Sequence, residues 1–454
     1  MSTKYKLSKF LEFNDLKQFD EERDEILVFS SVSNSLIQID KSTYVLLIDG
    51  RLEEIPQKDF ELLIGNNIVV KEGIDEIKTI IEENKDHASG NNVSLVLHSS
   101  ANCQFGCSYC GQAHVKKNIS STIKDKIYDY TDSQLKKSTG DLLYVMWHGA
   151  EPLMSLTNLR EMSQNLIRIA AVNNVDYKAK IITNALSLKP AIFEELYNEL
   201  KITEYQITID GNKDYHDSRR MTKDNKPTFD IIMKNIIEIT SNPMYDTYNY
   251  PIEIRINIDS SNADGIYGLI DLFSDLNLQD KIFISFYPVV NYTDNKFKNE
   301  NDLTLESYAQ IDVELLLYSI KKGFRQYSYL PGRTFQTCMA VNKNATMIDI
   351  YGNMYPCYSF PYTKHELESV NKIGNVIFDD LTYNNTPVLR NWYNEILETK
   401  NQCYDCSLLP SCGGSCPIKW HEGETPCPSF RFNIKERMLL EYLNVNNNFA
   451  KLLN

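Results

Sequence analysis

Three cysteines of this 454-residue chain, Cys103, Cys107 and Cys110, lie within one short loop at a C-x3-C-x2-C spacing. The apolar run at 93–97 directly before them predicts a β-strand. Fe–S clusters normally take four cysteine thiolates, so three can hold a cubane cluster and leave one iron open for another ligand. The alternatives are buried free thiols or a zinc loop, for which His114 is the only nearby fourth ligand.

Seven further cysteines lie near the C-terminus, and their spacing is the second chemical signal. They are Cys338, Cys357, Cys403, Cys406, Cys412, Cys416 and Cys427. Ten cysteines in a chain without a secretion signal indicate metal or redox chemistry rather than disulfides. A zinc knuckle is the alternative for the C-x2-C pair at 403–406.

The composition narrows the class of protein. The net charge is −14, from 61 acidic and 47 basic residues, and no Lys/Arg block stands out, so we expect no nucleic-acid partner. The N-terminus has no apolar signal region, and no run approaches 18 apolar residues. We therefore expect a cytoplasmic protein that does not bind a membrane, long enough for two or three domains.

Strands and helices alternate along the middle of the chain. The expected strands are 93–97, 142–147, 177–183, 205–209, 252–258 and 282–286, and the expected helices include 122–137, 156–171 and 190–200. This alternation predicts a parallel sheet, curved into a partial barrel, with its chemistry at the C-terminal ends of the strands.

The flanking regions have patterns of their own. Residues 1 to about 85 predict a small domain with strands at 25–30, 36–39 and 68–70 and two helices between the second and third strands. The charged stretch 76–87 and the turn at 90–92 form the expected boundary. Thr304 is expected to cap a helix that ends at Gly323.

Polar motifs follow the predicted strands in order. They are His148-Gly149-Ala150-Glu151-Pro152, Thr183-Asn184-Ala185, Thr208-Ile209-Asp210-Gly211 with His216-Asp217 and Arg220, and Arg255 with Asn257. Together with the cysteine loop they resemble the motifs of the radical S-adenosylmethionine (SAM) enzymes, over about residues 93–430. Ala150 and Ala185 stand where the family has glycine, so any need for a positive φ there would cause strain.

The resemblance implies a cofactor site. Cys103, Cys107 and Cys110 would hold a [4Fe–4S] cluster whose open iron binds SAM. The implied SAM contacts are Tyr109, Gly149, Ala150, Glu151, Pro152, Thr208, Arg220 and Asn257. In the family the aromatic residue at Tyr109 lies near the adenine, Glu151 meets the amino group, Arg220 grips the carboxylate and Asn257 lies near the ribose. The sequence indicates no catalytic base.

The C-terminal cysteines are similar, spacing for spacing, to those of the SPASM domain, the auxiliary-cluster extension of radical SAM peptide-modifying enzymes. The resemblance implies that Cys403, Cys406, Cys412 and Cys427 hold a distal auxiliary [4Fe–4S] cluster, and that Cys338, Cys357 and Cys416 hold an inner one. All ten cysteines are then used, and three clusters are expected. The inner cluster would have an open iron or a ligand other than cysteine.

The expected fold is therefore α/β. It comprises a partial (β/α)6 TIM-like barrel, a small N-terminal winged-helix-like domain and a C-terminal SPASM domain. The expected parts are a leader-peptide recognition-like domain at 1–88, the barrel at 91–290, a bridging region at 291–337, the SPASM domain at 338–430 and a C-terminal helix at 431–454.

The resemblance also implies a function. We expect a maturase that takes a hydrogen atom from a ribosomally made precursor peptide and installs a crosslink, with a thioether first and a C–C or C–O bond second. The N-terminal domain would bind the leader, or serve only as a structural cap, and an external donor such as flavodoxin or ferredoxin would supply electrons. One alternative is a sulfatase-maturing formylglycine enzyme, against which stands Tyr358 in place of an Asp. The other is a catalytically silent Fe–S scaffold that binds peptides.

Overall fold

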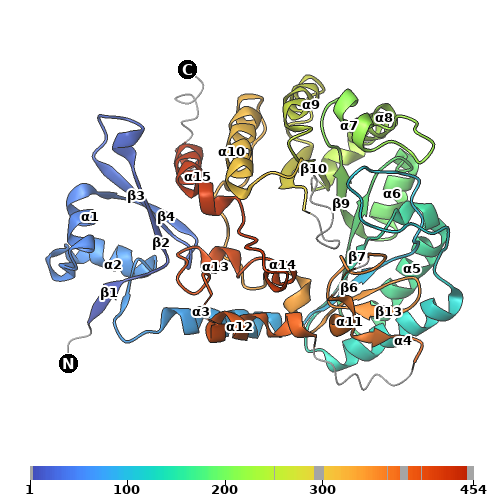
Figure 1. The fold of residues 1–454 in the computed structure, drawn as a ribbon, viewed down its shortest axis with the longest axis horizontal. Coiled ribbons are helices and arrows are strands. Elements are labelled where there is room, and N and C mark those ends of the chain that lie inside the picture. The colour runs from blue at the N-terminus through green and yellow to red at the C-terminus, as the bar shows by residue number, and fades with distance from the viewer. Residues whose placement is uncertain are drawn as a thin grey trace.

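A nine-stranded sheet is the largest sheet of the protein and lies in the right half of the computed structural model shown in Figure 1. The structure describes residues 4–249, 251–290, 301–363, 365, 367–378, 387–399 and 401–446. Parts of all five expected regions, at residues 1–3, 250, 291–300, 364, 366, 379–386, 400 and 447–454, lie outside the described residues.

The sheet has the strand order β11-β10-β9-β8-β7-β6-β12-β13-β14. Its first six strands in the chain are β6 (Val93–Leu97), β7 (Leu142–Trp147), β8 (Asp176–Thr183), β9 (Ile202–Thr208), β10 (Ile252–Ile258) and β11 (Ile282–Pro288). All six are parallel to their neighbours. The predicted α/β class and the six predicted strands are confirmed, although β9 begins three residues earlier than expected.

The helices cover one face of these strands. They are α4 (Ser121–Lys137), α5 (Leu156–Val172), α6 (Pro190–Asn198), α7 (Lys213–Arg219), α8 (Phe229–Thr240) and α9 (Ala263–Asp275). Along β10 the isoleucines at alternate positions are fully buried in the same core as the helices, whereas Glu253, Arg255 and Asn257 lie on the other face. Because successive side chains of a strand point to opposite faces of the sheet, β10 has one apolar face in the core and one polar face that can contribute functional groups.

The C-terminal region extends the same sheet, which the sequence analysis did not foresee. β12 (Ala345–Ile348) pairs in parallel with β6, and β13 (Asn353–Tyr355) and β14 (Gly374–Asn375) continue the sheet antiparallel. The edge beside β6 is therefore closed by the cysteine-rich region, and β11 forms the opposite edge of the sheet.

The N-terminal region contains two small sheets. β2 (Leu11–Asp15), β3 (Glu25–Ser30) and β4 (Ser35–Asp40) form one, and β1 (Tyr5–Leu7) pairs with β5 (Val69–Lys71) in the other. Helices α1 (Lys41–Ile48) and α2 (Gln57–Gly65) lie between β4 and β5 in the chain. The prediction missed β1 and β2, because both are short and neither has a clear alternation of apolar residues.

The stretch at 76–87 is not a simple boundary. It forms a regular helix, α3 (Glu76–Ala88), which Asp75 caps. Its buried residues Ile77, Ile80 and Ile81 share a core with Trp392 of α12 (Trp392–Thr399), and Figure 1 shows the two helices side by side. The charges that suggested a linker lie on the outer face of this amphipathic helix.

The remaining helices lie in the bridging region after β11 and in the C-terminal region. Thr304 caps α10 (Leu305–Lys321), as predicted, and α10 packs against α15 (Phe430–Val445). The short helices α11 (Glu368–Asn371), α13 (Leu409–Cys412) and α14 (Pro417–His421) lie in the cysteine-rich region. Within the described ranges, no helix combines the length and apolar character needed to cross a bilayer.

Candidate cluster and cofactor site

The cysteine loop after β6 is fixed against the segment that follows α7. Ser108 N donates to Arg219 O at 2.9 Å, and Gly106 N donates to Met221 O at 2.9 Å. In the other direction, Lys223 N donates to Gln104 O at 2.9 Å. This ladder of main-chain hydrogen bonds places Arg220 beside the cysteine loop.

The three thiols of the loop differ in environment. Cys103 is buried, Cys107 is partly buried and Cys110 is exposed. Burial raises the pKa of Cys103 to about 12, and burial also raises the pKa of Cys107, against the charge of Arg220. Cys103 and Cys107 are therefore protonated at neutral pH without a metal, and bound iron would supply the positive charge that holds them as thiolates.

The geometry does not favour the zinc alternative. Cys110 Sγ lies 3.7 Å from His114 Nε2. Across the described ranges, however, no three Cys, His, Asp or Glu side chains converge closely enough to hold a single ion. A tetrahedral zinc site needs four ligands around one ion, whereas a cluster distributes its cysteines over several irons.

Glu151 lies at the end of β7 and connects it to β8. Its Oε1 accepts hydrogen bonds from Thr183 Oγ1 at 2.7 Å and from Leu153 N at 3.0 Å, and its Oε2 accepts one from Asn184 N at 2.7 Å. The side chain is only 1% exposed, and burial raises the pKa of the carboxyl despite these donors. Glu151 is thus a rigid acceptor at the C-terminal edge of the sheet.

Ala150 and Ala185 both have the left-handed backbone that was anticipated as a source of strain. Their φ angles are +46° and +58°. Gly149 precedes Ala150 with φ +84°, and a Cβ there would lie 2.3 Å from the His98 ring. The glycine is therefore required sterically, whereas the two alanines occupy conformations that cost about 1 kcal/mol each. Gln112 Oε1 accepts a hydrogen bond from Ala150 N at 3.1 Å, which helps to fix this turn.

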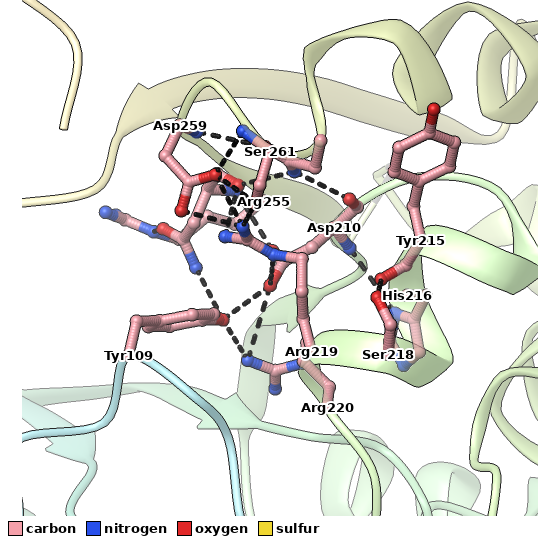
Figure 2. A network of polar contacts seen from close by, with 12 residues as sticks. Tyr109, Asp210, Tyr215, His216, Ser218, Arg219, Arg220, Arg255, Asp259 and Ser261 are labelled. Atoms are coloured by element: carbon pink, nitrogen blue, oxygen red, sulfur yellow. Dashed lines mark hydrogen bonds and ion pairs between the residues drawn. The ribbon is translucent and has the colours of Figure 1, made fainter. Parts of the chain in front are cut away.

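Tyr109 joins the cysteine loop to the ends of β9 and β10 (Figure 2). Its hydroxyl donates to Asp210 Oδ2 at 2.6 Å and accepts from Arg220 Nη1 and from Asn257 Nδ2. Asp210 Oδ1 accepts from the main-chain nitrogen of Asn257 at 3.1 Å. Burial raises the pKa of Tyr109 well above its ordinary value, so the phenol remains a donor.

A buried ion pair stands beside this network. Arg219 Nη1 lies 2.7 Å from both carboxylate oxygens of Asp259, and Ser261 Oγ accepts from the same atom at 2.7 Å. The Nε atoms of Arg219 and Arg220 are buried and have no hydrogen-bond partner among the described residues. Unsatisfied guanidinium donors at the end of a parallel sheet are suited to a carboxylate ligand. The site therefore fits a SAM-like molecule.

Two further residues of the motif after β9, His216 and Asp217, have structural roles. His216 Nδ1 lies 3.3 Å from Asp210 N and accepts its hydrogen bond, and Nε2 lies 3.1 Å from Thr228 Oγ1. Asp217 Oδ1 accepts from the main-chain nitrogens of Thr228 and Phe229 at the start of α8. These contacts hold the segment that carries Arg220 without reaching the site. Thr208 is buried at the end of β9, opposite Arg255 of β10, and Pro152 begins the short 3-10 helix Pro152–Ser155.

Cys338, Cys357 and Cys416 lie together in the C-terminal region. Burial, and then the charges of the other two thiols, raise the pKa of Cys338 to about 12. Burial raises the pKa of Cys357 to about 11, and its Sγ lies 3.0 Å from Ser359 Oγ. The three side chains share a core with buried residues of β6 and β12. These three cysteines are therefore packed against the nine-stranded sheet.

The other four cysteines, Cys403, Cys406, Cys412 and Cys427, surround a small separate cavity. Arg431, in the first turn of α15, lies beside it, and its Nη1 donates to Cys427 Sγ at 2.7 Å. Four thiols around a void, with a cation at its rim, fit a fully ligated cluster of net negative charge. In total, the chain brings its ten cysteines together as groups of three, three and four.

An aromatic group bridges the ends of β6 and β7 and the inner cysteines. The ring of His148 lies 4.9 Å from that of Tyr358, and 5.5 Å from that of His98. Desolvation by the surrounding protein, and then the charge of Arg255, lower the pKa of His148 to about 4. His148 is therefore neutral at physiological pH and is a weak base, so it is not a good candidate for general base catalysis.

Comparison with known proteins identifies the class of protein to which this arrangement belongs. The profile of the radical SAM superfamily matches residues 97–251. The chain is 21% identical over 352 residues to the cysteine-type anaerobic sulfatase-maturating enzyme of Clostridium novyi (strain NT), covering 71% of this chain and 87% of that protein. It is 19% identical over 362 residues to the serine-type anaerobic sulfatase-maturating enzyme of Bacteroides thetaiotaomicron, covering 71% of this chain and 82% of that protein.

Solved structures agree in fold. Native anSMEcpe with bound AdoMet and Cp18Cys peptide superposes with a TM-score of 0.57 at 16% identity, covering 79% of this chain and 99% of that chain. Native anSMEcpe with bound AdoMet superposes with a TM-score of 0.56 at 16% identity, covering 78% of this chain and 99% of that chain. Residues 97–251 are therefore a radical SAM domain, in an enzyme related to the anaerobic sulfatase-maturating enzymes, and the cysteine-rich C-terminal region fits a SPASM-like domain. Membership of this family implies a [4Fe–4S] cluster and SAM as cofactors.

Several residues of the site escaped the sequence analysis. Arg219 and Asp259 form a buried pair, and Gln112 fixes the turn at Ala150. Asp259 directly follows β10, so the rule that chemistry gathers at strand ends could have identified it. Nothing in the sequence indicates the contact of Gln112, because it depends on how the long loop after β6 folds back.

Proposed function

We propose that this enzyme is a peptide maturase that forms a thioether crosslink in a ribosomally made precursor. The observation that carries the proposal is the group of three cysteines at Cys338, Cys357 and Cys416, for which the sequence contains no eleventh cysteine as a fourth partner. A cluster held by only three thiolates has an iron to which a substrate cysteine, a soft ligand, is well matched.

The proposed cofactors are three [4Fe–4S] clusters and SAM. Their chemistry is the abstraction of a hydrogen atom by a SAM-derived radical and the acceptance of the single electron released as the C–S bond closes. In balance, one C–H and one S–H bond break and one C–S bond forms, with one hydrogen atom, one proton and one electron released. The protein's residues bind, orient and enclose the reactants.

Specific residues would orient SAM. Arg220 would bind the carboxylate, which its unsatisfied Nε supports, and the rigid Glu151 would accept from the amino group. Tyr109 and Asn257 share a hydrogen bond at the rim and would contact the adenosine. Gly149, Ala150 and Pro152 shape the turn that carries Glu151, and Thr208 completes the end of β9. A site of this kind needs rigid supports, which the Tyr109–Asp210 hydrogen bond provides.

The substrate would be a precursor peptide. One structural neighbour was solved with a peptide bound beside AdoMet, which supports a peptide partner for this chain. In the N-terminal sheet, β4 pairs only with β3 among the described strands. The outer edge of β4 is therefore our proposed binding site for the leader, by addition of a strand. Electrons would come from an external donor such as flavodoxin or ferredoxin.

Other outcomes compete with the thioether. A C–C or C–O crosslink would need no substrate thiolate on the inner cluster. The curated relatives favour formylglycine formation, but Tyr358 occupies the position at which the resemblance expects an Asp. A silent scaffold would be consistent with Ala150 and Ala185 at the strained positions.

The test is spectroscopic. Anaerobically reconstituted protein should carry about twelve irons per chain, as three [4Fe–4S] clusters. A precursor that contains cysteine should change the EPR or Mössbauer signature of the inner cluster, and the Cys-to-Ser precursor should not. The variant Cys416→Ala serves to assign that signal. A protein side chain that remains bound to the fourth iron in the presence of the peptide would rule out the thiolate role and favour C–C crosslinking.

A further inference from the structure

Within the described part of the chain, the outer edge of β11 is open. β11 pairs with β10, and no other described strand lies beside it. Val289 N donates to Ile258 O at 2.8 Å, so the odd-numbered residues direct their main-chain groups toward β10. Because main-chain directions alternate along a strand, Ile284 and Phe286 direct their N–H and C=O groups toward the open edge. Pro288, in the same phase, has no N–H to offer.

A groove of about 500 Å³ follows this edge. Side chains from both faces of β11 line it, so it runs along the edge itself rather than over one face. Its far wall comes from α10, α15 and the segment 326–328, with Tyr327, Asp312 and Arg437 among its residues. Arg437 Nη2 and Asp312 Oδ2 form an ion pair of 2.5 Å, so these two charges neutralise each other. The wall therefore does not select strongly for charge.

The groove also exposes aromatic side chains. Phe283 is 48% exposed, Tyr287 is 39% exposed and Tyr327 is fully exposed. Natural sheets usually protect an open edge with charges, bulges or a covering element. An open edge with exposed aromatic residues instead resembles a surface that accepts another strand.

Contacts connect this groove to the cysteine loop. The guanidinium of Arg255 lies 4.0 Å from the centre of the Tyr287 ring. Arg255 Nε donates to Asn257 Oδ1 at 2.8 Å, and Asn257 Nδ2 donates to Tyr109 OH at 3.2 Å. A chain bound along β11 would therefore reach the C-terminal strand ends, where the candidate SAM site lies.

We propose that the open edge of β11 binds an extended segment of the substrate peptide as an additional strand, with its side chains over Tyr287. This inference rests on the proposed function, because it assigns the segment that carries the reacting residue. The main-chain groups of Ile284 and Phe286 provide the pairing, and pairing ends at Pro288. Main-chain pairing gives affinity with little demand on sequence, so the site accepts varied segments that lack proline.

The probe is a pool of synthetic peptides, Ac-Xaa3-Cys-Xaa3-NH2, in which Xaa is any residue except Pro and Cys. The control pool carries an N-methyl group on every main-chain amide, which removes the donors of both edges while keeping the side chains. Hydrogen–deuterium exchange is measured on the full-length reconstituted enzyme without SAM or reductant. We expect the first pool to slow exchange in the segment 282–288 by about threefold or more, and the methylated pool to have no such effect.

Two variants sharpen the test. Ile284→Pro removes an outward N–H that makes no bond to β10, and it should abolish the protection of Phe286. Ile284→Ala, which keeps the N–H, should retain it. The proposal would be overturned if both pools slowed exchange in residues 282–288 equally, or if neither pool slowed it in the wild-type enzyme. Because exchange at β11 does not report on the inner cluster, this result is independent of the EPR or Mössbauer measurement that tests the proposed function.

Discussion

The main-chain nitrogen of Asn184 donates a hydrogen bond of 2.7 Å to Oε2 of Glu151, linking the ends of two neighbouring parallel strands. Thr183 Oγ1 donates to the other carboxylate oxygen at the same distance. The motif at the end of β7 is therefore oriented by the motif at the end of β8. A side chain fixed in this way keeps its position whether or not a ligand is present, which favours catalysis by orientation.

Replacing Glu151 by Gln should weaken SAM binding roughly tenfold or more, because the ammonium of SAM loses a charged acceptor and an amide N–H₂ faces the donors of Thr183 or Asn184. The measurement is SAM titration by isothermal calorimetry on reconstituted protein. The variant Glu199→Gln changes an exposed carboxylate and should bind SAM as the wild type does. Unchanged affinity in Glu151→Gln would contradict the assigned role.

The same variant should change the pH dependence of stability. Burial raises the pKa of Glu151 above its ordinary value of 4.5, so the native state binds this proton more tightly than the unfolded chain. The stabilisation is complete below that value and is lost as the pH rises through the raised pKa. Urea unfolding from pH 4 to 8 should therefore show a smaller decline in the free energy of unfolding for Glu151→Gln than for Glu199→Gln. Identical slopes would be inconsistent with a raised pKa.

Ala150→Gly and Ala185→Gly should each stabilise the protein by about 1 kcal/mol, because glycine adopts a positive φ without strain. Greater freedom of the unfolded glycine offsets part of this gain. The control is Ala171→Gly in α5, which should destabilise by about 0.5–1 kcal/mol. Thermal unfolding measures all three. Destabilisation by both glycines at 150 and 185 would show that the turns are not strained.

Arg431→Gln should lower the reduction potential of the cluster proposed at Cys403, Cys406, Cys412 and Cys427, because it removes a cation and a hydrogen bond from the Cys427 sulfur. A tenfold change in the reduction equilibrium would correspond to about 59 mV for a one-electron couple. Redox titration followed by EPR gives the potential. Arg431→Lys should retain much of the effect, and Lys435→Gln, the same charge change one turn along α15, should leave the potential near that of the wild type. Equal shifts in Arg431→Gln and Lys435→Gln would indicate only a long-range effect of net charge.

Gln38→Pro should raise the KM for a full-length precursor at least about tenfold without reducing SAM cleavage in the absence of peptide. Lys41 N donates to Asp24 O, so the odd-numbered residues of β4 pair with β3 and Gln38 directs its N–H to the open edge. Gln38→Ala is the matched control and should retain the wild-type KM. A point change is preferable to deleting the domain, because Phe10 and α3 share a core with Trp392. Normal kinetics for Gln38→Pro would favour a structural cap.

Strong local patterns made much of this fold predictable. β10 runs from Ile252 to Ile258 as expected, because its alternating isoleucines leave little doubt about period or length. Pairing between distant segments was not predictable: β12 joins β6 across more than half of the chain, and no local pattern determines that partner. The helical face of α3 was hidden by its charges.

The candidate site shows the same division. The strand-end rule predicts that Glu151, Arg220 and Asn257 lie in one region, because the C-terminal ends of parallel strands meet at one edge. In the structure Arg220 and Asn257 both donate to the hydroxyl of Tyr109, and the charge of Arg220 acts on Glu151. The resemblance implied a SAM contact for Arg220 and assigned no role to His216 and Asp217, which support the segment that carries Arg220. That distinction depends on the path of the chain after α7, which is set by its hydrogen bonds to the cysteine loop.

The most direct test of the central claim is mass spectrometry of a cysteine-containing precursor after incubation with dithionite-reduced enzyme and SAM. For a thioether maturase we expect a peptide that has lost two hydrogen atoms, with the cysteine thiol no longer alkylatable, and 5′-deoxyadenosine formed in equal amount. The variant in which Cys103, Cys107 and Cys110 are all replaced by Ala should yield neither product. 5′-Deoxyadenosine formed by that variant, or a wild-type product whose cysteine remains a free thiol, would contradict the account.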